Sequence, residues 1–208
     1  MIKKIFFLLN VLIKYKKKIF KVSFFEISYS IIMGRAYYKI YNDALQADSL
    51  PCPYYFIYKI SKFIKKTQIK DVIDLGSGNG RVVNFLSTKT NARIKGFEKD
   101  KEIYNYSIKN LNKNAEIELK DISFINYSNL NVDCYILNTP FWQELVLKNL
   151  IDKIFSSNMS KLKKYYIIII NTDVILKKIS LEKLFENFKL IKFVNAGPVR
   201  SLRIYESK

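Results

Sequence analysis

A glycine-rich turn between a strand and a helix constrains the fold more than any other stretch of this chain. The turn, residues 74–80, has the sequence Asp-Leu-Gly-Ser-Gly-Asn-Gly. Residues 70–73 before it are typical of a short buried strand, and residues 81–86 after it have helical periodicity. Because glycine has no Cβ, the turn can adopt positive φ angles and lie close to a ligand. The following helix would add free N–H groups and the positive end of its dipole.

The charge at this turn limits the ligand that it can bind. Dinucleotide-binding turns have the spacing Gly-x-Gly-x-x-Gly. Here the spacing is Gly-x-Gly-x-Gly, and a carboxylate, Asp74, precedes it. A carboxylate there would repel a pyrophosphate but would attract a ligand with cationic groups. The ammonium and sulfonium groups of S-adenosylmethionine are groups of this kind.

Two further acids lie at the ends of predicted strands. Glu98 follows the strand-like run 93–97 and comes after Gly78 by about the interval expected for a ribose-binding acid. Asp121 follows the next strand-like run, residues 117–120. Three acids at three strand ends would surround one nucleoside.

Together these motifs resemble those of the class I S-adenosylmethionine-dependent methyltransferases, from Pro53 to the C-terminus. The resemblance implies that S-adenosyl-L-methionine is the cofactor, that Glu98 binds its ribose, and that Asp121 lies beside the adenine amine. The cofactor-binding residues that it implies are Asp74, Gly76, Ser77, Gly78, Gly80, Glu98, Asp121 and Ile122. The alternative is a glycine turn in another α/β nucleotide-binding protein, with the acids as ordinary strand-end charges.

Strand-like and helix-like segments alternate from residue 70 onward, which predicts an α/β fold with a doubly wound, mostly parallel sheet. The predicted strands are 70–75, 93–98, 115–120, 132–137, 165–171, 188–194 and 201–206. The predicted helices among them are 80–89, 101–112, 143–157 and one near 180–187. The last two strands resemble the antiparallel hairpin that ends class I methyltransferase sheets. We therefore expect a seven-stranded Rossmann-like sheet whose ligand lies at the carboxyl ends of the strands.

A second motif, residues 138–142, follows the fourth predicted strand and has the sequence Asn-Thr-Pro-Phe-Trp. It resembles the Asn/Asp-Pro-Pro-Tyr/Phe loop of amino-methyltransferases that act on planar nitrogens. This resemblance implies a catalytic group in which Asn138 orients the acceptor nitrogen, Pro140 shapes the loop and Phe141 stacks on the substrate. Thr139 replaces a proline of that loop and makes the turn less rigid. The alternative is an ordinary strand-to-helix turn with aromatic packing.

Composition excludes several other kinds of chemistry. The chain has no histidine, so histidine acid–base catalysis is excluded, and without a Cys/His cluster we expect no metal site. The two cysteines, Cys52 and Cys134, lie far apart and are typical of reduced residues in a cytoplasmic protein. Methyl transfer needs neither group, because the sulfonium is already activated and the enzyme supplies proximity, alignment and a dry pocket.

The chain of 208 residues suits one methyltransferase domain, residues 51–208, and an N-terminal helical extension, residues 1–50. Pro51 and Pro53 would end the preceding segment, and Pro53 suits the start of a helix predicted over residues 54–65.

Residues 1–25 contain seven lysines and no acid. An apolar face at three- and four-residue steps predicts an amphipathic helix, and its members are Ile5, Leu8, Leu12, Tyr15, Ile19 and Val22. The apolar run is too short to span a bilayer, and no signal-peptide cleavage site follows it. Two interpretations remain: residues 1–22 contact an anionic membrane peripherally, or the helix packs on its own domain or on a second subunit.

The net charge of +18 favours an acidic partner, either nucleic acid or a membrane surface. It is also expected of an AT-rich coding sequence, and the dispersed lysines with few arginines weaken specific nucleic-acid recognition. The methyl acceptor therefore stays open between a protein nitrogen, a nucleic acid and a small molecule or glycan. The segment 74–83 is similar to membrane-associated protein lysine methyltransferases, which favours the first. A scaffold or sensor that binds the cofactor without transfer is the non-enzymatic alternative.

Overall fold

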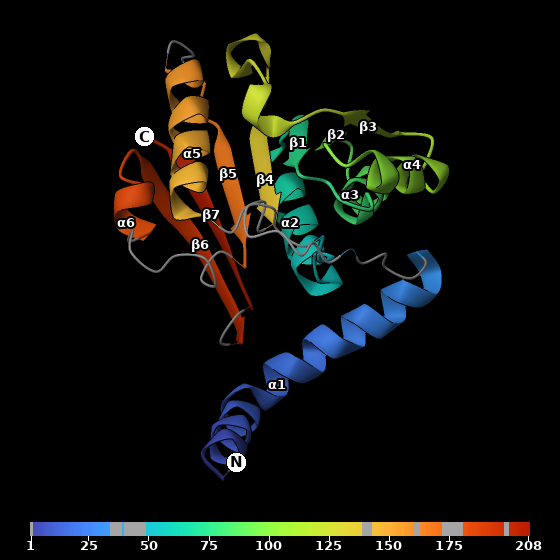
Figure 1. The fold of residues 1–208 in the computed structure, drawn as a ribbon, viewed down its shortest axis with the longest axis vertical. Helices are drawn as coiled ribbons and strands as arrows, with labels where there is room; N and C mark the ends of the chain where they lie inside the picture. The colour runs from blue at the N-terminus through green and yellow to red at the C-terminus, as the bar shows by residue number, and fades with distance from the viewer. Residues whose placement is uncertain are drawn as a thin grey trace.

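The computed structural model describes residues 2–33, 39, 49–138, 143–159, 163–171, 181–197 and 200–208, with side chains in the first helix from residue 16 to residue 32. Within these ranges the chain forms a seven-stranded sheet of order β3-β2-β1-β4-β5-β7-β6, with helices on both faces (Figure 1). The strands are β1 Asp71–Leu75, β2 Arg93–Glu98, β3 Ala115–Leu119, β4 Cys134–Asn138, β5 Tyr166–Ile170, β6 Phe188–Gly197 and β7 Arg200–Ser207.

Strand direction agrees with the predicted topology. The five strands β1 to β5 pair in parallel, and β7 pairs antiparallel with both β5 and β6. The parallel part follows from the alternation of strands and helices, which needs a crossover between neighbouring strands. The predicted Rossmann-like sheet with its C-terminal antiparallel hairpin is confirmed.

The helices agree with the predicted segments to within a few residues, with three differences. The helices are α1 Ile2–Met33, α2 Tyr54–Thr67, α3 Arg81–Lys89, α4 Lys101–Lys109, α5 Glu144–Asn158 and α6 Leu181–Leu184, with short 3-10 helices η1 Ile122–Phe124 and η2 Tyr127–Asn129. The helix predicted over 101–112 ends three residues earlier, the helix predicted near 180–187 ends at Leu184, and the first helix continues to Met33. Asp100 begins α4, because its carboxylate accepts hydrogen bonds from the N–H groups of Glu102 and Ile103.

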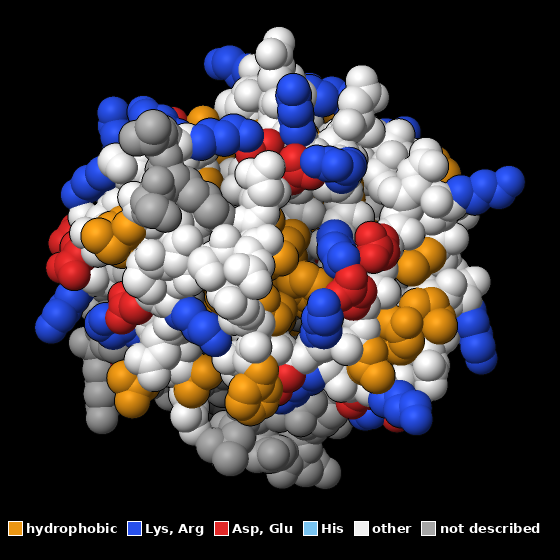
Figure 2. Space-filling model, turned by 90° about the horizontal axis from the view of Figure 1, so that it is seen from above, with side chains coloured by type: hydrophobic (Ala, Val, Ile, Leu, Met, Phe, Trp, Pro, Cys, Tyr) orange, Lys and Arg blue, Asp and Glu red, His pale blue; other side chains and the backbone are white. Residues whose placement is uncertain are grey.

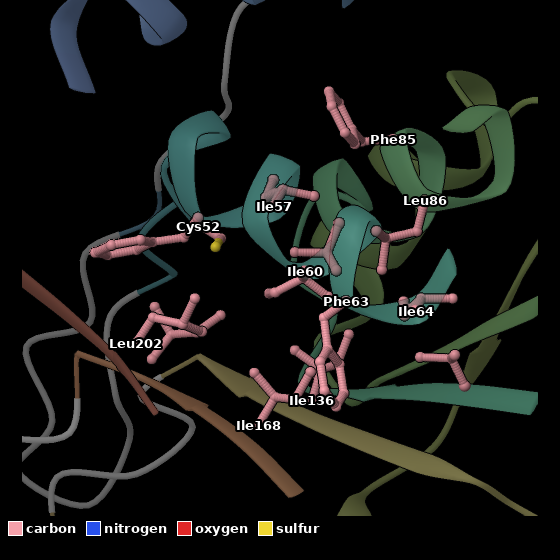
Figure 3. Packing of buried hydrophobic residues seen from close by; sticks show 14 of the residues in the cluster. Cys52, Ile57, Ile60, Phe63, Ile64, Phe85, Leu86, Ile136, Ile168 and Leu202 are labelled. Carbon is pink, nitrogen blue, oxygen red and sulfur yellow. The ribbon is translucent and has the colours of Figure 1, made fainter. Parts of the chain in front are cut away.

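Two apolar clusters fill the two faces of the sheet. The alternation of side chains along β5 divides its isoleucines between them: Ile168 and Ile170 belong to the cluster with α2 and α3, and Ile167 and Ile169 to the cluster with α5 and α6. Figure 3 shows the first of these clusters, where Phe63 of α2 lies over the sheet. A strand buried on both faces explains the continuous apolar run in the sequence.

One side of α1 packs on the domain. Val22 is buried, Phe25 lies against Tyr58 with ring centroids 4.9 Å apart, and Tyr29 lies edge-on to Phe85 at 5.0 Å. Val22 and the half-buried Ile19 belong to the predicted apolar face, so this part of that face packs on its own domain. The predicted face members from residue 5 to residue 15 lie outside the described side chains.

Arg81, the first residue of α3, holds α1 against the domain. The Arg81 guanidinium is almost fully buried and forms an ion pair with Glu26 of α1. It also donates a 3.3 Å hydrogen bond to the Cys52 carbonyl and lies 4.2 Å from the ring centre of Tyr54. The second carboxylate oxygen of Glu26 accepts a 3.2 Å hydrogen bond from the Tyr54 N–H at the start of α2. One acid of α1 thus binds the first turns of both α2 and α3.

We predict that Glu26→Ala destabilises the protein by about 2 kcal/mol, because it leaves the buried Arg81 charge without its carboxylate. Urea unfolding measures the change. Asp152→Ala is the matched control, since it removes an exposed ion pair with Lys148 within α5 and should cost below about 0.5 kcal/mol. An equal decrease in the free energy of unfolding in the two variants would show that the buried ion pair stabilises the protein no more than the exposed one.

Candidate active site

The glycine turn is fastened to the neighbouring strand by its backbone. The N–H groups of Gly76 and Ser77 both donate to the Phe97 carbonyl of β2, at 3.0 and 2.9 Å. Gly78 has φ +54°, and a Cβ added there would lie 3.2 Å from the Ser49 hydroxyl oxygen. The turn therefore needs glycine at this position for both its backbone conformation and its close packing.

Glycine is also required where β2 passes beneath the turn. A Cβ added to Gly96 would lie 2.7 Å from the side chain of Ser77 and 2.9 Å from that of Val83. The absence of a side chain at Gly96 therefore lets the turn and the start of α3 lie directly against the strand. The spacing of glycines in residues 74–80 does not predict this requirement.

Asp74 is buried beside the turn without a partner. Its side chain is 1% exposed, and neither carboxylate oxygen has a hydrogen-bond partner within the described part of the chain. Burial, followed by the negative charge of Glu98, raises the pKa of Asp74 to about 8. A positive charge placed beside this buried carboxylate would stabilise its ionised form, so the position suits a cationic ligand group.

Glu98, the last residue of β2, is hydrogen-bonded to the glycine turn. Its carboxylate accepts hydrogen bonds from the N–H of Gly78 at 2.9 Å and from the N–H of Asp100 at 2.8 Å. Burial raises the pKa of Glu98, while backbone N–H groups, including those of Asp100 and Gly78, oppose this rise. The structure thus brings Glu98 into contact with the turn that lies about twenty residues before it, as its spacing in the sequence predicts.

Asp121 and Ile122 lie just beyond β3, on the far side of β2 from the turn. Asp121 is half-buried and begins η1 by accepting a 2.8 Å hydrogen bond from the Ser123 N–H. Ile122 is buried in the apolar cluster that also contains Phe97. Because β1, β2 and β3 are parallel neighbours, Asp74, Glu98 and Asp121 follow one another along the carboxyl edge of the sheet.

Asn138 ends β4 on the other side of β1. Its amide nitrogen donates a 2.9 Å hydrogen bond to the Leu50 carbonyl, and its side-chain oxygen accepts a 3.4 Å hydrogen bond from the Asn171 amide. These two contacts fix which way the amide faces. The other predicted catalytic residues, Pro140 and Phe141, lie outside the described residues.

Asn171 lies beside Asn138 at the candidate site and was not predicted from the sequence. It follows β5 directly with φ +57°, an unusual angle for a residue other than glycine, and its side-chain oxygen is buried with no partner among the described residues. The sequence did contain a sign of it: Asn171 follows a continuous apolar strand, just as Asn138 follows the strand predicted before it.

Comparison with known proteins agrees with this geometry. The sequence profile of the methyltransferase small domain family matches residues 60–196, and the chain belongs to this family. Comparison with curated proteins gives no match. Among solved structures, the chain is similar in fold to an RNA methyltransferase from Salinibacter ruber in complex with S-adenosyl-L-homocysteine, with TM-score 0.54, 17% identity and coverage of 76% of this chain and 94% of that one.

Two other solved structures have the same fold. The N-methyltransferase NodS from Bradyrhizobium japonicum has TM-score 0.56 and 10% identity over 72% of this chain and 93% of that one. The magnesium protoporphyrin IX methyltransferase from Synechocystis, solved with bound S-adenosylmethionine, has TM-score 0.53 and 10% identity over 74% and 77% of the two chains. The protein is a class I methyltransferase that uses S-adenosylmethionine.

We predict that cofactor binding at pH 6.5 releases up to about one proton. Asp74 is protonated in the free protein at this pH, because its pKa is about 8, and a cation beside it would lower that pKa. Titration calorimetry in two buffers of different ionisation enthalpy measures the proton release. In Asp74→Asn the release should vanish, whereas an unchanged release in this variant would assign the proton to another group.

Asp74 should also make the free protein less stable as the pH rises. Its carboxyl binds a proton more tightly in the folded state than in the unfolded chain, so its contribution to stability is lost as the pH rises from about 4 to about 8. We predict that Asp74→Asn raises the stability of the cofactor-free protein at pH 8 by on the order of a few kcal/mol. Thermal unfolding at pH 8 and pH 5 measures this, and a gain at pH 5 as large as at pH 8 would contradict the prediction.

Proposed function

We propose that this methyltransferase methylates a nitrogen atom of its acceptor, either in a protein side chain or in another amine or amide. The observation that carries this proposal is the fixed amide of Asn138 at the end of β4, next to the strand that leads into the glycine turn. An amide oxygen held in this way can accept a hydrogen bond from the acceptor's N–H and so direct the nitrogen lone pair.

The cofactor would lie along the carboxyl edge of β1, β2 and β3. Asp74 would pair with its ammonium group, since its buried oxygens have no hydrogen-bond partner among the described residues. The backbone of residues 76–80 would lie against it. Glu98 would bind the ribose hydroxyls, because a carboxylate has about four acceptor sites and the backbone N–H groups of Gly78, Lys99 and Asp100 do not use all of them. Asp121 and Ile122 would border the adenine.

The bound cofactor supplies a methyl group on a positively charged sulfur. In the transfer, the acceptor nitrogen forms a bond to the methyl carbon while the carbon–sulfur bond breaks and its electron pair stays on sulfur. The proton of the methylated nitrogen then passes to solvent. Asn138 would orient the nitrogen, and Asn171 would hold Asn138 through their 3.4 Å contact. That long contact leaves acceptor capacity on the Asn138 oxygen for the substrate N–H.

A nucleic-acid nitrogen is a second candidate acceptor, favoured by the net charge of +18. Figure 2 looks onto the end of the molecule away from α1, where lysine and arginine side chains are interspersed with acidic ones, so the face in that view is not one continuous basic surface. A small-molecule or glycan nitrogen is a third. Contact between residues 1–22 and an anionic membrane depends on α1 and not on this site, so it is a separate matter.

The test follows a labelled methyl group from S-adenosylmethionine into the protein, nucleic-acid and small-molecule fractions of a cell extract. We expect hydrolysis of the labelled fraction to yield an N-methylated amino acid, base or amine, identified by chromatography against standards. Label that base releases as methanol, as from a methyl ester, or label recovered in a methyl ether would contradict a nitrogen acceptor.

With an acceptor fraction in hand, Asn138→Ala should lower the rate of transfer by about 10- to 100-fold, because the nitrogen is no longer aligned. The affinity for the cofactor, measured by calorimetry, should change by less than about threefold. Asn114→Ala is the control, since Asn114 is exposed in the segment before β3. Normal transfer by Asn138→Ala would contradict the assigned role, and loss of cofactor binding would place Asn138 in the cofactor site instead.

A further inference from the structure

The outer side of α1 carries an apolar stripe that faces away from the domain. Its residues follow steps of four, three and four and therefore lie in one line along the helix. The side chains are exposed by 71% at Phe20, 59% at Phe24, 65% at Ile27 and 80% at Ile31. The buried residue Val22 lies on the opposite side of the helix. Figure 1 shows α1 as a long rod beneath the rest of the fold, with only one side toward it.

Positive charge borders this stripe. Lys16, Lys17, Phe20 and Lys21 line a shallow groove on α1, and all three of these lysines are exposed. The only acid in α1, Glu26, is used by its contacts with Arg81 and with the Tyr54 N–H. The outer side of α1 within residues 16–32 therefore combines large apolar side chains with cations and carries no carboxylate of its own.

The neighbouring elements add further positive charge. Both α2 and β6 contact α1. Burial lowers the pKa of Lys192 on β6, and the positive charges of Lys59 and Lys66 on α2 lower it further, which shows that these three lysines lie close together. Cations thus gather on the elements against which α1 packs.

Few partners satisfy both properties of this surface. A second copy of the chain packed on the stripe would cover its apolar side chains but would leave Lys16, Lys17 and Lys21 without an acidic partner on that side of α1, because Glu26 is used by Arg81 and the Tyr54 N–H. The phosphates of a nucleic acid would pair with the lysines, but the phenylalanines and isoleucines would stay exposed to water. An anionic bilayer satisfies both, because apolar side chains enter the boundary of the acyl chains while lysines contact the headgroups. No helix in the described ranges is long and apolar enough to cross a membrane, so the contact would be interfacial.

The position of α1 connects this surface to the active site. Glu26 binds Arg81, which directly follows the glycine turn at Gly80. Because α1 is held at this end of α3, a bilayer on its outer side would lie at the end of the domain where the cofactor binds.

We propose that the outer side of α1 binds the surface of an anionic bilayer and places the carboxyl edge of the sheet beside it. The residues that make this contact are Lys16, Lys17, Phe20, Lys21, Phe24, Ile27 and Ile31. The proposal does not depend on the nitrogen acceptor. It differs from the sequence-based expectation for residues 1–22, because the apolar residues involved are on the other side of the helix and extend to Ile31.

The test is co-sedimentation of the full chain with phosphatidylcholine vesicles that contain or lack phosphatidylglycerol. We expect binding to the anionic vesicles only, weakened by added salt. The double variant Phe20→Ser with Phe24→Ser should bind at least about tenfold more weakly, because two large apolar side chains no longer enter the bilayer. These side chains are exposed, so the fold and the cofactor affinity should be unchanged.

Two sets of lysine variants distinguish contact of the α1 lysines with the membrane from attraction by the net positive charge of the whole protein. The triple variant Lys16→Gln, Lys17→Gln, Lys21→Gln should weaken binding at least about tenfold. Its matched control removes three exposed lysines elsewhere, at Lys101, Lys109 and Lys113, and should bind much as the unaltered chain does. Equal losses in the two triple variants, binding to neutral vesicles, or unaltered binding by the phenylalanine variant would each overturn the proposal. A dimer in solution that the phenylalanine variant dissociates would make a second copy the partner instead.

Discussion

A carboxylate buried without a partner is the constraint on which the active site depends. Asp74 lies inside β1, where the sheet around it is apolar, and neither of its oxygens has a hydrogen-bond partner among the described residues. Burial and the charge of Glu98 raise the pKa of Asp74 to about 8, so in the free protein this carboxyl is largely protonated and uncharged near neutral pH. A positive charge beside Asp74 would stabilise the ionised carboxylate, and we therefore expect the ammonium group of S-adenosylmethionine to lie there. The glycine turn and Glu98 are arranged around it.

The same end of the domain also holds the N-terminal helix. Arg81 begins α3 directly after the glycine turn, and its buried guanidinium is neutralised by Glu26 of α1. Since Glu26 also binds the Tyr54 N–H, it joins the first turns of α2 and α3. An element outside the family match, which begins at residue 60, is thereby in contact with the segment that carries the first motif.

The parts of the site that the sequence predicts are those that depend on short-range patterns. Spacing placed Glu98 opposite Gly78, and the structure joins them through a 2.9 Å hydrogen bond. Asn138 was identified by its motif, but its partners Leu50 and Asn171 were not, because they lie 88 and 33 residues away along the chain. The sequence also could not predict that residue 96 must be glycine, because the requirement comes from the side chain of Ser77, which lies on another segment.

The sequence by itself determined the seven strands, their mainly parallel arrangement and the acids at the carboxyl edge, because apolar periodicity and glycine spacing act over a few residues. The tertiary structure decided what the predicted apolar face of α1 contacts. Periodicity selected Ile19 and Val22 but left open whether they meet a membrane, a second subunit or the domain, and the structure packs them on the domain. The choice rests on Glu26, whose carboxylate must meet the buried Arg81, and only the folded chain brings these two charges together.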